Sequence, residues 1–357
     1  MNEVEKIIDD KNWNIDAETK NRLSSLIQKF IPEYSKNLVL LDILQFSSYF
    51  VTHVYKLVCE DNGNLISFYA KFAYLPKEFE KRQRERIKYE YDCTVSIYNV
   101  FESKEKFDSV KAVAFYEEES AFVMQEMQGK RLDELLLSSM KPFSSQNKDY
   151  LYQTMHSAGE WLKIFQNSMP VLGETVFSKE VLEARVLSYF DKVNALDSSI
   201  ITTKLKQKLI SKCKKAIASF SQEDLVITAK HNDYAPWNLM ADDSTIIGFD
   251  YADVEYDSSY YDVYHFTRAL NSFKLKPIKN AKVIEACKQH FLNGYGLDIP
   301  MDHPTRIYFN IFFSLERLQM LLRAKKRNSG FVGKLKTLSQ KRHFRLYLSE
   351  LNRIANL

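Results

Sequence analysis

The pattern of apolar and polar residues divides the chain into a β-rich first third and a helix-rich remainder. In residues 4–30, apolar side chains recur among charged ones, which predicts one or two amphipathic helices. Between residues 38 and 74, alternating apolar runs flank Asp61-Asn62-Gly63-Asn64, and Asn-Gly between such runs is typical of a β-hairpin. A charged, helix-like stretch follows Pro76, and two more strand-like runs then end at Gln128-Gly129.

Helical periodicity dominates beyond residue 128 and is interrupted by one short β-like block at 225–253. No period of 20 to 50 residues repeats, which excludes solenoids and propellers. We therefore expect an α+β, two-lobed chain. Residues 1–37 would form an N-terminal helical extension, 38–127 a small β-rich N-lobe that binds nucleotide, and 128–357 a larger helical C-lobe with the catalytic and substrate-binding residues.

The composition is that of an ordered globular enzyme, because 45% of the 357 residues are hydrophobic and 27% are charged. The formal net charge of +4 is too weak to indicate a nucleic-acid or membrane partner, and the chain lacks the signature of a nucleic-acid-binding fold. No apolar run reaches the about 20 residues of a membrane span. The acidic start lacks the apolar stretch of a signal peptide, and we expect a cytoplasmic protein.

The cysteine and histidine spacing argues against two kinds of stabilising site. The four cysteines form no Cys-x-x-Cys pair, and the seven histidines show no His-x-His or His-x-x-x-His spacing. Neither a disulfide framework nor a zinc site is therefore indicated.

The block from Lys230 to Val263 carries the clearest candidate chemistry. Asp233 is followed five residues later by Asn238, and Asp250 comes at the end of an apolar run. Phosphoryl transfer uses such groups: a carboxylate to orient and deprotonate an attacking hydroxyl, and amide and carboxylate oxygens to hold Mg²⁺ against phosphates. The alternative interpretation is that Asp233 and Asn238 only cap turns, as Asx residues often do.

The spacing His-x-Asp-x-x-x-x-Asn, followed by hydrophobic-x-hydrophobic-Asp, resembles the aminoglycoside phosphotransferase and choline kinase family, which has a protein-kinase-like fold. The resemblance implies that Asp233 is the catalytic base and that Asn238 and Asp250 are Mg²⁺ ligands. It also implies that His231 braces the catalytic loop without reacting, and that Asp262 ties this loop down through hydrogen bonds to backbone amides.

The chain departs from the family pattern at three places. Ser259 and Val263 replace the Pro and Leu that the family has around the position of Asp262, and Asn232 replaces a Gly. Asn tolerates left-handed backbone better than most residues do. The expected phosphate-covering loop, Phe46–His53, contains no glycine, although glycine best allows close approach of backbone to phosphate.

The nucleotide-binding half of the site is expected upstream, where Ile66–Phe72 reads as a strand with Lys71 near its end. In the family, the lysine of this strand contacts the α and β phosphates and is held by a glutamate from the next helix. Glu90 is our candidate for that glutamate, and Glu85 is its competitor. A lysine that ends a strand is otherwise usually a solvated edge charge.

Residues Ala121–Gly129 form an apolar strand that runs into a Gly-bearing connector, similar to the family's hinge between lobes. The resemblance implies that backbone groups around Gln125 to Met127 meet the adenine edge of ATP, with Val123 and Met124 as apolar wall. A plain core strand is the alternative interpretation.

Together these features predict an ATP- and Mg²⁺-dependent phosphotransferase that acts on a hydroxyl of a small molecule. A sugar or glycan precursor is favoured, because the loop Ala235-Pro236-Trp237-Asn238 is similar to that of members associated with bacterial surface-glycan pathways. The alternatives are a degenerate kinase-fold binding protein without turnover, and an aminoglycoside or choline-type amino-alcohol kinase.

Local charge bears on the choice of acceptor. A polycationic acceptor would favour an acidic pocket, part of which Asp253, Glu255 and Asp257 could supply. Residues 301–357, however, contain 12 Lys and Arg against 3 Asp and Glu. This segment either presents a solvated helical face or holds an anionic substrate or partner through Arg317, Arg323, Lys325, Lys326 and Arg327.

Overall fold

The computed structural model describes residues 4, 7, 8, 16–48, 52–75, 78–141, 148–169, 176–243, 245–275, 280–298, 300, 303–327 and 331–357, without the side chains of 46–48, 326–327 and 331–339. The chain forms two compact units. The sheet-rich unit comprises Met1–Lys130 and Leu239–Val254, and the helical unit comprises Arg131–Asn238 and Glu255–Leu357.

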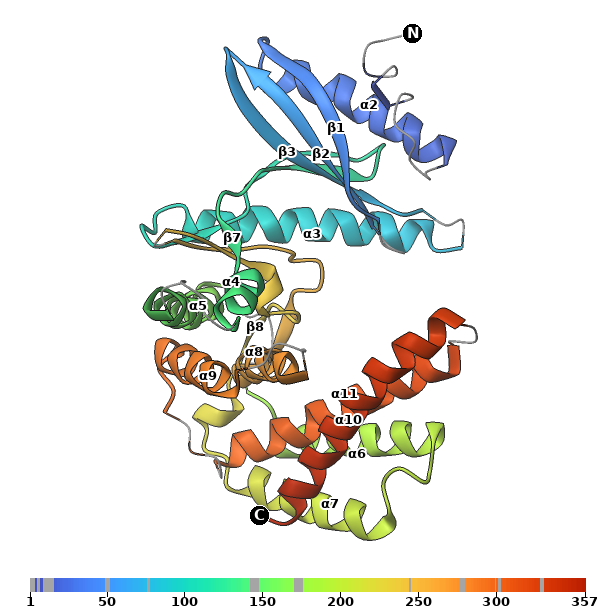
Figure 1. Ribbon diagram of the computed structural model, residues 1–357, viewed down its shortest axis with the longest axis vertical. Coiled ribbons are helices and arrows are strands. Elements are labelled where there is room, and N and C mark those ends of the chain that lie inside the picture. The colour runs from blue at the N-terminus through green and yellow to red at the C-terminus, as the bar shows by residue number, and fades with distance from the viewer. Residues whose placement is uncertain are drawn as a thin grey trace. The chain divides into compact units, whose positions relative to one another are not determined.

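An antiparallel sheet of five strands, in the order β1-β2-β3-β6-β5, forms the centre of the sheet-rich unit (Figure 1). The strands are β1 (Leu38–Ser48), β2 (Thr52–Asp61), β3 (Asn64–Ala73), β5 (Ala112–Tyr116) and β6 (Ala121–Gln125). The predicted Asn-Gly hairpin joins β2 to β3, where Asn62 and Gly63 both have positive φ.

Helices cover both faces of this sheet. On one face, apolar residues of α2 (Ala17–Tyr34) form a core with the even-numbered residues of β3, and the rings of Phe30 and Phe68 meet edge to face at 4.9 Å. The predicted N-terminal helix thus shares the core of this unit. On the other face, α3 (Glu80–Phe101) packs on Ala73 and Phe122 through Ile87. Because side chains alternate along a strand, Lys71 faces α3.

A second, smaller sheet has the order β4-β10-β9-β7 and contains β4 (Phe107–Ser109), β7 (Lys130–Arg131), β9 (Leu239–Asp242) and β10 (Thr245–Gly248). Residues 239–254 therefore group with the sheet-rich unit, although the sequence placed them in the helical lobe. The reason is a parallel pairing of β10 with β4, which neighbouring sequence does not reveal. Gly129, at φ 104°, passes so close to Ala241 that a Cβ there would meet the Ala241 carbonyl oxygen.

The helical unit is built from α-helices with a two-stranded sheet of β8 (Ile227–Lys230) and β11 (Glu255–Ser258). The helices are α4 (Leu132–Ser139), α5 (Lys148–Ser168), α6 (Lys179–Leu196), α7 (Thr203–Ala218), α8 (Tyr260–Ser272), α9 (Ala281–Tyr295), α10 (Pro304–Arg327) and α11 (Phe331–Ala355). The apolar run 307–315 lies in α10 and forms a core with α6, α7, α8 and α11. Among the helices described, none has both the length and the apolarity that a membrane crossing needs.

Two glycines allow α5 and α9 to pack closely. A Cβ at Gly159 would meet the carbonyl oxygen of Phe291, and one at Gly294 would meet that of His156. This contact orients α5. Its Trp161 stacks on Tyr234 and its Phe165 meets His231, both in the segment that follows β8. All four cysteines are free and buried, as the absence of a disulfide pattern predicted.

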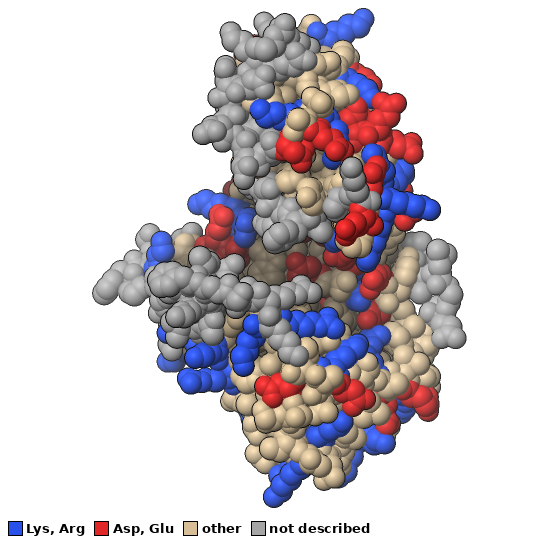
Figure 2. Space-filling view, turned by 90° about the vertical axis from the view of Figure 1, so that its right-hand side faces the viewer, with Lys and Arg blue, Asp and Glu red and all other residues tan. Residues whose placement is uncertain are grey.

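The basic C-terminal segment is only partly exposed. On the face shown in Figure 2, Lys and Arg side chains are spread over the helical unit with Asp and Glu among them, and charges of both signs are also interspersed on the sheet-rich unit. Arg323 and Lys325 of α10 are exposed, but Arg317 is half-buried. The side chains of Lys326 and Arg327 lie outside the described residues.

Candidate active site

In the sheet-rich unit, Lys71 of β3 and Glu90 of α3 form a buried ion pair. The Lys71 Nζ lies 2.5 Å from Glu90 Oε1, and the two residues are 9% and 2% exposed. Glu85, the competing candidate, points elsewhere: its side chain is exposed and lies 3.9 Å from Lys81 Nζ. Because five residues turn an α-helix by about 1.4 turns, only one of the two glutamates can face the sheet.

Lys71 also contacts Asp250, whose Oδ1 lies 2.9 Å from its Nζ. Burial opposes the charge of Lys71, but the attraction of Glu90 and Asp250 outweighs it and raises the pKa of Lys71 above its ordinary value. The lysine is therefore protonated at neutral pH. Asp250 has a left-handed backbone at φ 68°, a conformation that is uncommon for non-glycine residues and that Asp adopts more readily than most.

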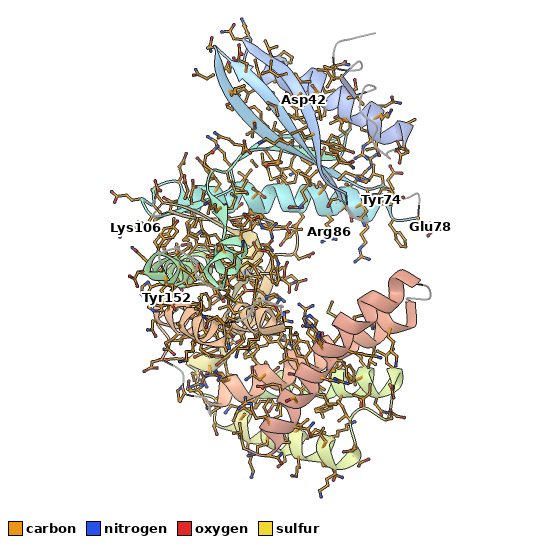
Figure 3. All side chains as sticks on the ribbon, in the orientation of Figure 1. Asp42, Tyr74, Glu78, Arg86, Lys106 and Tyr152 are labelled. Carbon is orange, nitrogen blue, oxygen red and sulfur yellow. The ribbon has the colours of Figure 1, made fainter. Side chains whose placement is uncertain are left out.

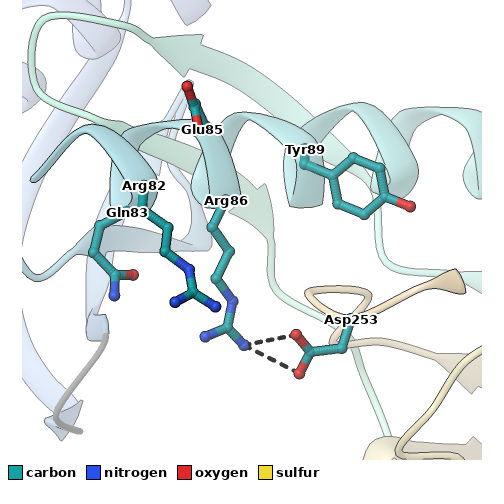
Figure 4. Close-up of a pocket in the computed structure, with 6 residues that line it drawn as sticks. All are labelled: Arg82, Gln83, Glu85, Arg86, Tyr89 and Asp253. Atoms are coloured by element: carbon teal, nitrogen blue, oxygen red, sulfur yellow. Dashed lines mark hydrogen bonds and ion pairs between the residues drawn. The ribbon is translucent and has the colours of Figure 1, made fainter. Parts of the chain in front are cut away.

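A polar pocket of about 530 Å³ lies in the same unit, beside α3 (Figure 4). It is lined by Arg82, Gln83, Glu85, Arg86, Tyr89 and Asp253. Arg86 points away from strands β1–β3 (Figure 3) and binds Asp253 with distances of 2.9 and 3.0 Å to its two oxygens. Asp253, one of the carboxylates proposed for an acidic acceptor pocket, is thus already paired with a cation.

The connector after β6 offers fewer backbone groups than the sequence suggested. The Gln125 N–H donates to the carbonyl of Lys111 at 2.9 Å, and the Glu126 N–H donates to that of Ser67 at 3.0 Å. Met127 is half-buried, and its N–H makes no hydrogen bond to another described residue. Of the three backbone N–H groups from Gln125 to Met127, that of Met127 is therefore the one not used in a hydrogen bond to another described residue.

In the helical unit, Asp262 of α8 holds the segment that follows β8. Its carboxylate accepts hydrogen bonds from the backbone N–H groups of His231 at 2.6 Å and Asn232 at 3.1 Å, the contacts that the family resemblance implies. Asn232 adopts φ 72°, so Asn here takes the left-handed conformation for which the family uses Gly. Burial raises the pKa of Asp262 to about 7 against the opposing effect of these donors and of Lys230.

His231 is fully buried and lies among aromatic rings. The rings of Tyr234 and Phe165 meet it at centroid distances of 5.8 and 6.3 Å. Tyr234 in turn stacks on Trp161 and donates a hydrogen bond to the carbonyl of Ala158. These contacts fix the turn between β8 and the short 3₁₀ helix Pro236–Asn238.

Asp233 lies on this turn with its carboxylate half-exposed. Its two hydrogen-bond donors, Trp237 and Asn238, follow it by four and five residues. The amide nitrogen of Asn238 donates to Asp233 Oδ2 at 3.0 Å and to its carbonyl at 2.9 Å, and the indole N–H of Trp237 donates to Oδ2 at 3.2 Å. Because the Asn238 nitrogen is used in this way, the amide oxygen is the atom left to face a cation. The Asp233 Oδ1 is the oxygen left to accept a proton.

His265 is a neighbour of Asp233 that sequence reasoning missed. It is buried on α8, and its Nε2 lies 3.8 Å from Asp233 Oδ1. Its Nδ1 lies 3.1 Å from the Tyr234 carbonyl, which can only accept, so Nδ1 carries the proton. Burial, together with the charges of Arg268 and Arg317, lowers the pKa of His265 well below its ordinary value. A neutral ring therefore presents its bare Nε2 to Asp233. One sequence signal existed: His265 follows Asp262 at helical i, i+3 spacing.

The remaining two carboxylates proposed for an acidic pocket are also neutralised. Asp257 binds Arg185 at 2.8 Å and Lys230 at 3.3 Å, and Glu255 binds Lys230 at 3.1 Å. The segment 253–257 therefore does not form the unpaired acidic surface that a polycationic acceptor would require.

The candidate Mg²⁺ ligands are suitable in chemistry, since Asn238 and Asp250 both offer hard oxygen donors. Within the described ranges, no cluster of three or more His, Cys, Asp or Glu side chains could hold a metal ion. Each of these residues could supply one oxygen to a cation, and Mg²⁺ usually takes the rest of its shell from phosphate oxygens and water.

Comparison with solved structures establishes the fold. Plasmodium vivax ethanolamine kinase matches 98% of this chain and 96% of its own length at 12% identity, with a TM-score of 0.53. A thermostable mutant of aminoglycoside phosphotransferase APH(4)-Ia, solved with ADP and hygromycin B, matches over 93% and 97% at 11% identity, with a TM-score of 0.56. A choline/ethanolamine kinase family protein from Mesorhizobium loti matches over 92% and 99% at 12% identity, with a TM-score of 0.52.

No protein-family model matches the chain, and no match to a curated protein was found. The structural likenesses confirm the predicted α+β, protein-kinase-like fold. At such low identities they show the fold alone, and function rests on the site.

Proposed function

We propose that the protein is an ATP- and Mg²⁺-dependent phosphotransferase that phosphorylates a hydroxyl group of a small molecule. The observation that supports this most strongly is Lys71, buried between Glu90 and Asp250 at 2.5 and 2.9 Å. A buried ion pair is a poor source of stability, because desolvation offsets most of its attraction. A protonated lysine held next to a candidate metal ligand is explained better by phosphate binding.

The sheet-rich unit would bind the nucleotide. Lys71 would contact the α and β phosphates, and the free N–H of Met127 would meet the adenine edge. The residues Phe46–His53, expected to cover the phosphates, are described only in part: β1 ends at Ser48, β2 begins at Thr52, and residues 49–51 lie outside the described residues. Two of the solved structures with this fold contain ADP or AMP-PNP, which supports a nucleotide ligand here.

The helical unit would activate the acceptor. Asp233 would orient the hydroxyl and accept its proton on Oδ1 while the new O–P bond forms and the bond from the γ-phosphorus to the bridging oxygen breaks, leaving a phosphate ester and ADP. Asn238 and Asp250 would hold Mg²⁺, which neutralises charge on the phosphates. Asp262 would fix the loop by accepting hydrogen bonds from its backbone. His231 would fix it through the packing of its buried ring against Tyr234 and Phe165. Among acceptors, we propose a sugar or a related polyol.

The test is Mg²⁺-dependent ATP binding followed by a screen of hydroxyl compounds for ADP release. Asp233→Asn should leave ATP affinity within about twofold and reduce turnover by a factor on the order of 10³ or more. Asp191→Asn, at an exposed ion pair on α6, is the matched control and should change neither. Absence of ATP binding at millimolar concentration would refute the enzyme and favour a kinase-fold binding protein without turnover.

A further inference from the structure

One face of α8 leads from Asp233 to a pair of arginines. Tyr261, His265 and Arg268 recur at i, i+4 and i+7, so they share one stripe of the helix. His265 adjoins Asp233, and Arg268 lies one turn further along. Its guanidinium stacks on the ring of Phe313 from α10 at 4.9 Å. The same Phe313 ring meets His265 at 5.9 Å, so one aromatic residue supports both side chains.

Arg317 follows Phe313 by one turn of α10, so the two side chains lie on the same stripe of that helix. Its charge lowers the pKa of His265, and it is the largest effect after burial that lowers the pKa of Arg268. Two guanidinium groups therefore repel each other within a half-buried region. The attraction of Glu316 offsets this only in part, and Glu316 forms no ion pair within 4.0 Å with either arginine.

Neither arginine has an anionic partner in the described part of the chain. No carboxylate oxygen of a described residue lies within 4.0 Å of either guanidinium, and the Nε atoms of both are buried without a hydrogen-bond partner among those residues. Arg185, in the same unit, does have an anionic partner, because its Nη1 lies 2.8 Å from the carboxylate of Asp257. Leaving a buried donor unsatisfied costs about 1–3 kcal/mol, and more for charged groups.

We propose that Arg268 and Arg317 bind an anionic group, a carboxylate or a phosphate, of the acceptor whose hydroxyl is presented to Asp233. The inference rests on the proposed phosphotransferase function and specifies its substrate class. Guanidinium groups suit such oxyanions because their planar donors pair with two oxygens at once. Stacking on Phe313 holds one guanidinium in place before the ligand arrives, which reduces the entropy lost on binding.

The spacing along α8 bears on the size of this acceptor. His265 and Arg268 are three residues apart, a rise of about 4.5 Å between their backbone positions. We take the hydroxyl and the anionic group to belong to one small molecule, such as a sugar acid or a sugar phosphate, because this spacing is short. Choline, ethanolamine and aminoglycosides carry positive charge, which the two arginines would repel. The paired state of Asp253, Glu255 and Asp257 agrees with this exclusion.

The test compares D-gluconate, glucose 6-phosphate, glucose and glucosamine as ligands of the full-length protein by calorimetry, without nucleotide. At least one of the two anions should bind more tightly than glucose by about tenfold or more, and the anion that does so shows whether a carboxylate or a phosphate is preferred. Arg268→Gln and Arg317→Gln should each remove this preference. Arg323→Gln, an exposed position on α10, is the matched control and should retain it.

Two results would overturn the anion site. One is that glucose or glucosamine binds as tightly as both anions. The other is that Arg323→Gln loses the preference for the anion to the same extent as Arg268→Gln and Arg317→Gln. Melting temperatures of all variants identify any that fail to fold, and Arg317→Gln then carries the test alone. Mg²⁺-ATP binding is measured separately. Anion binding without ATP binding would refute the proposed phosphotransferase function and support the anion site. ATP-dependent turnover of neutral acceptors but not of anionic ones would refute the anion site and support the phosphotransferase function.

Discussion

The backbone N–H of His231 donates a hydrogen bond of 2.6 Å to the Asp262 carboxylate, and this contact ties the loop of Asp233 to helix α8. The same helix places His265 against Asp233. One helix therefore fixes both the backbone of the catalytic loop and the surroundings of its carboxylate, and each of these contacts has a measurable consequence.

The burial of Asp262 predicts a specific pH dependence of stability. Its pKa rises to about 7 in the folded protein, so between about pH 4 and 7 the folded state binds more protons than the unfolded state. The free energy of unfolding should therefore fall as pH rises through this window, by on the order of 1 kcal/mol per pH unit from this group. Asp262→Asn should flatten the slope, as urea unfolding at pH 5, 6 and 7 would measure. An unchanged slope would contradict the shift.

The neutral state of His265 predicts the opposite sign. Because burial and the nearby arginines lower its pKa, the unfolded state binds the proton first. The stabilising contribution is complete above about pH 6.5 and is lost as pH falls below that value. Nitrogen-15 NMR should show a neutral, Nδ1-protonated ring that does not titrate between about pH 6 and 8. A His265 ring that titrates near pH 6.5 would refute the assignment.

Removal of the Lys71 charge should destabilise the protein and weaken nucleotide binding. Lys71→Met leaves Glu90 and Asp250 without their cation, so unfolding should become easier by about 3–5 kcal/mol. Lys71→Met combined with Glu90→Gln should recover part of that loss, because the buried carboxylate is also neutralised. Glu85→Gln is the control, since Glu85 makes only a 3.9 Å exposed contact. Denaturant unfolding measures the loss of stability, and ATP titration measures the loss of nucleotide binding. If the changes in unfolding free energy of the two single variants simply added up in the double variant, Lys71 and Glu90 would not be coupled.

Two glycines with positive φ separate backbone strain from steric overlap. Gly63 and Gly129 have φ of 81° and 104°, but a Cβ would meet open space at Gly63 and the Ala241 carbonyl at Gly129. Gly63→Ala should therefore lower the free energy of unfolding by about 1 kcal/mol from strain alone. Gly129→Ala should lower it by about 2 kcal/mol or more, because overlap is added. Equal melting temperatures for the two variants would show that β9 moves aside freely.

Local patterns in the sequence were sufficient for features whose partners lie close along the chain. The Asn-Gly hairpin joins residues within a few positions, where turn chemistry decides the geometry. The left-handed Asn232 was expected because it stands where the family has Gly. The family resemblance added Asp262, which is distant in sequence but belongs to the same pattern of residues.

The tertiary structure decided which distant groups meet. The sequence left Glu85 and Glu90 as competitors, and only the packing of α3 on β3 selected Glu90. It suggested an acidic surface at 253–257, where Arg86, Lys230 and Arg185 in fact neutralise the charges. Beyond the i, i+3 spacing from Asp262, it gave no sign of His265 beside Asp233, and it gave none of Arg268 packed on Phe313. Residue order constrains short-range geometry through the backbone, whereas these contacts depend on how separate helices and strands pack, which their local composition does not encode.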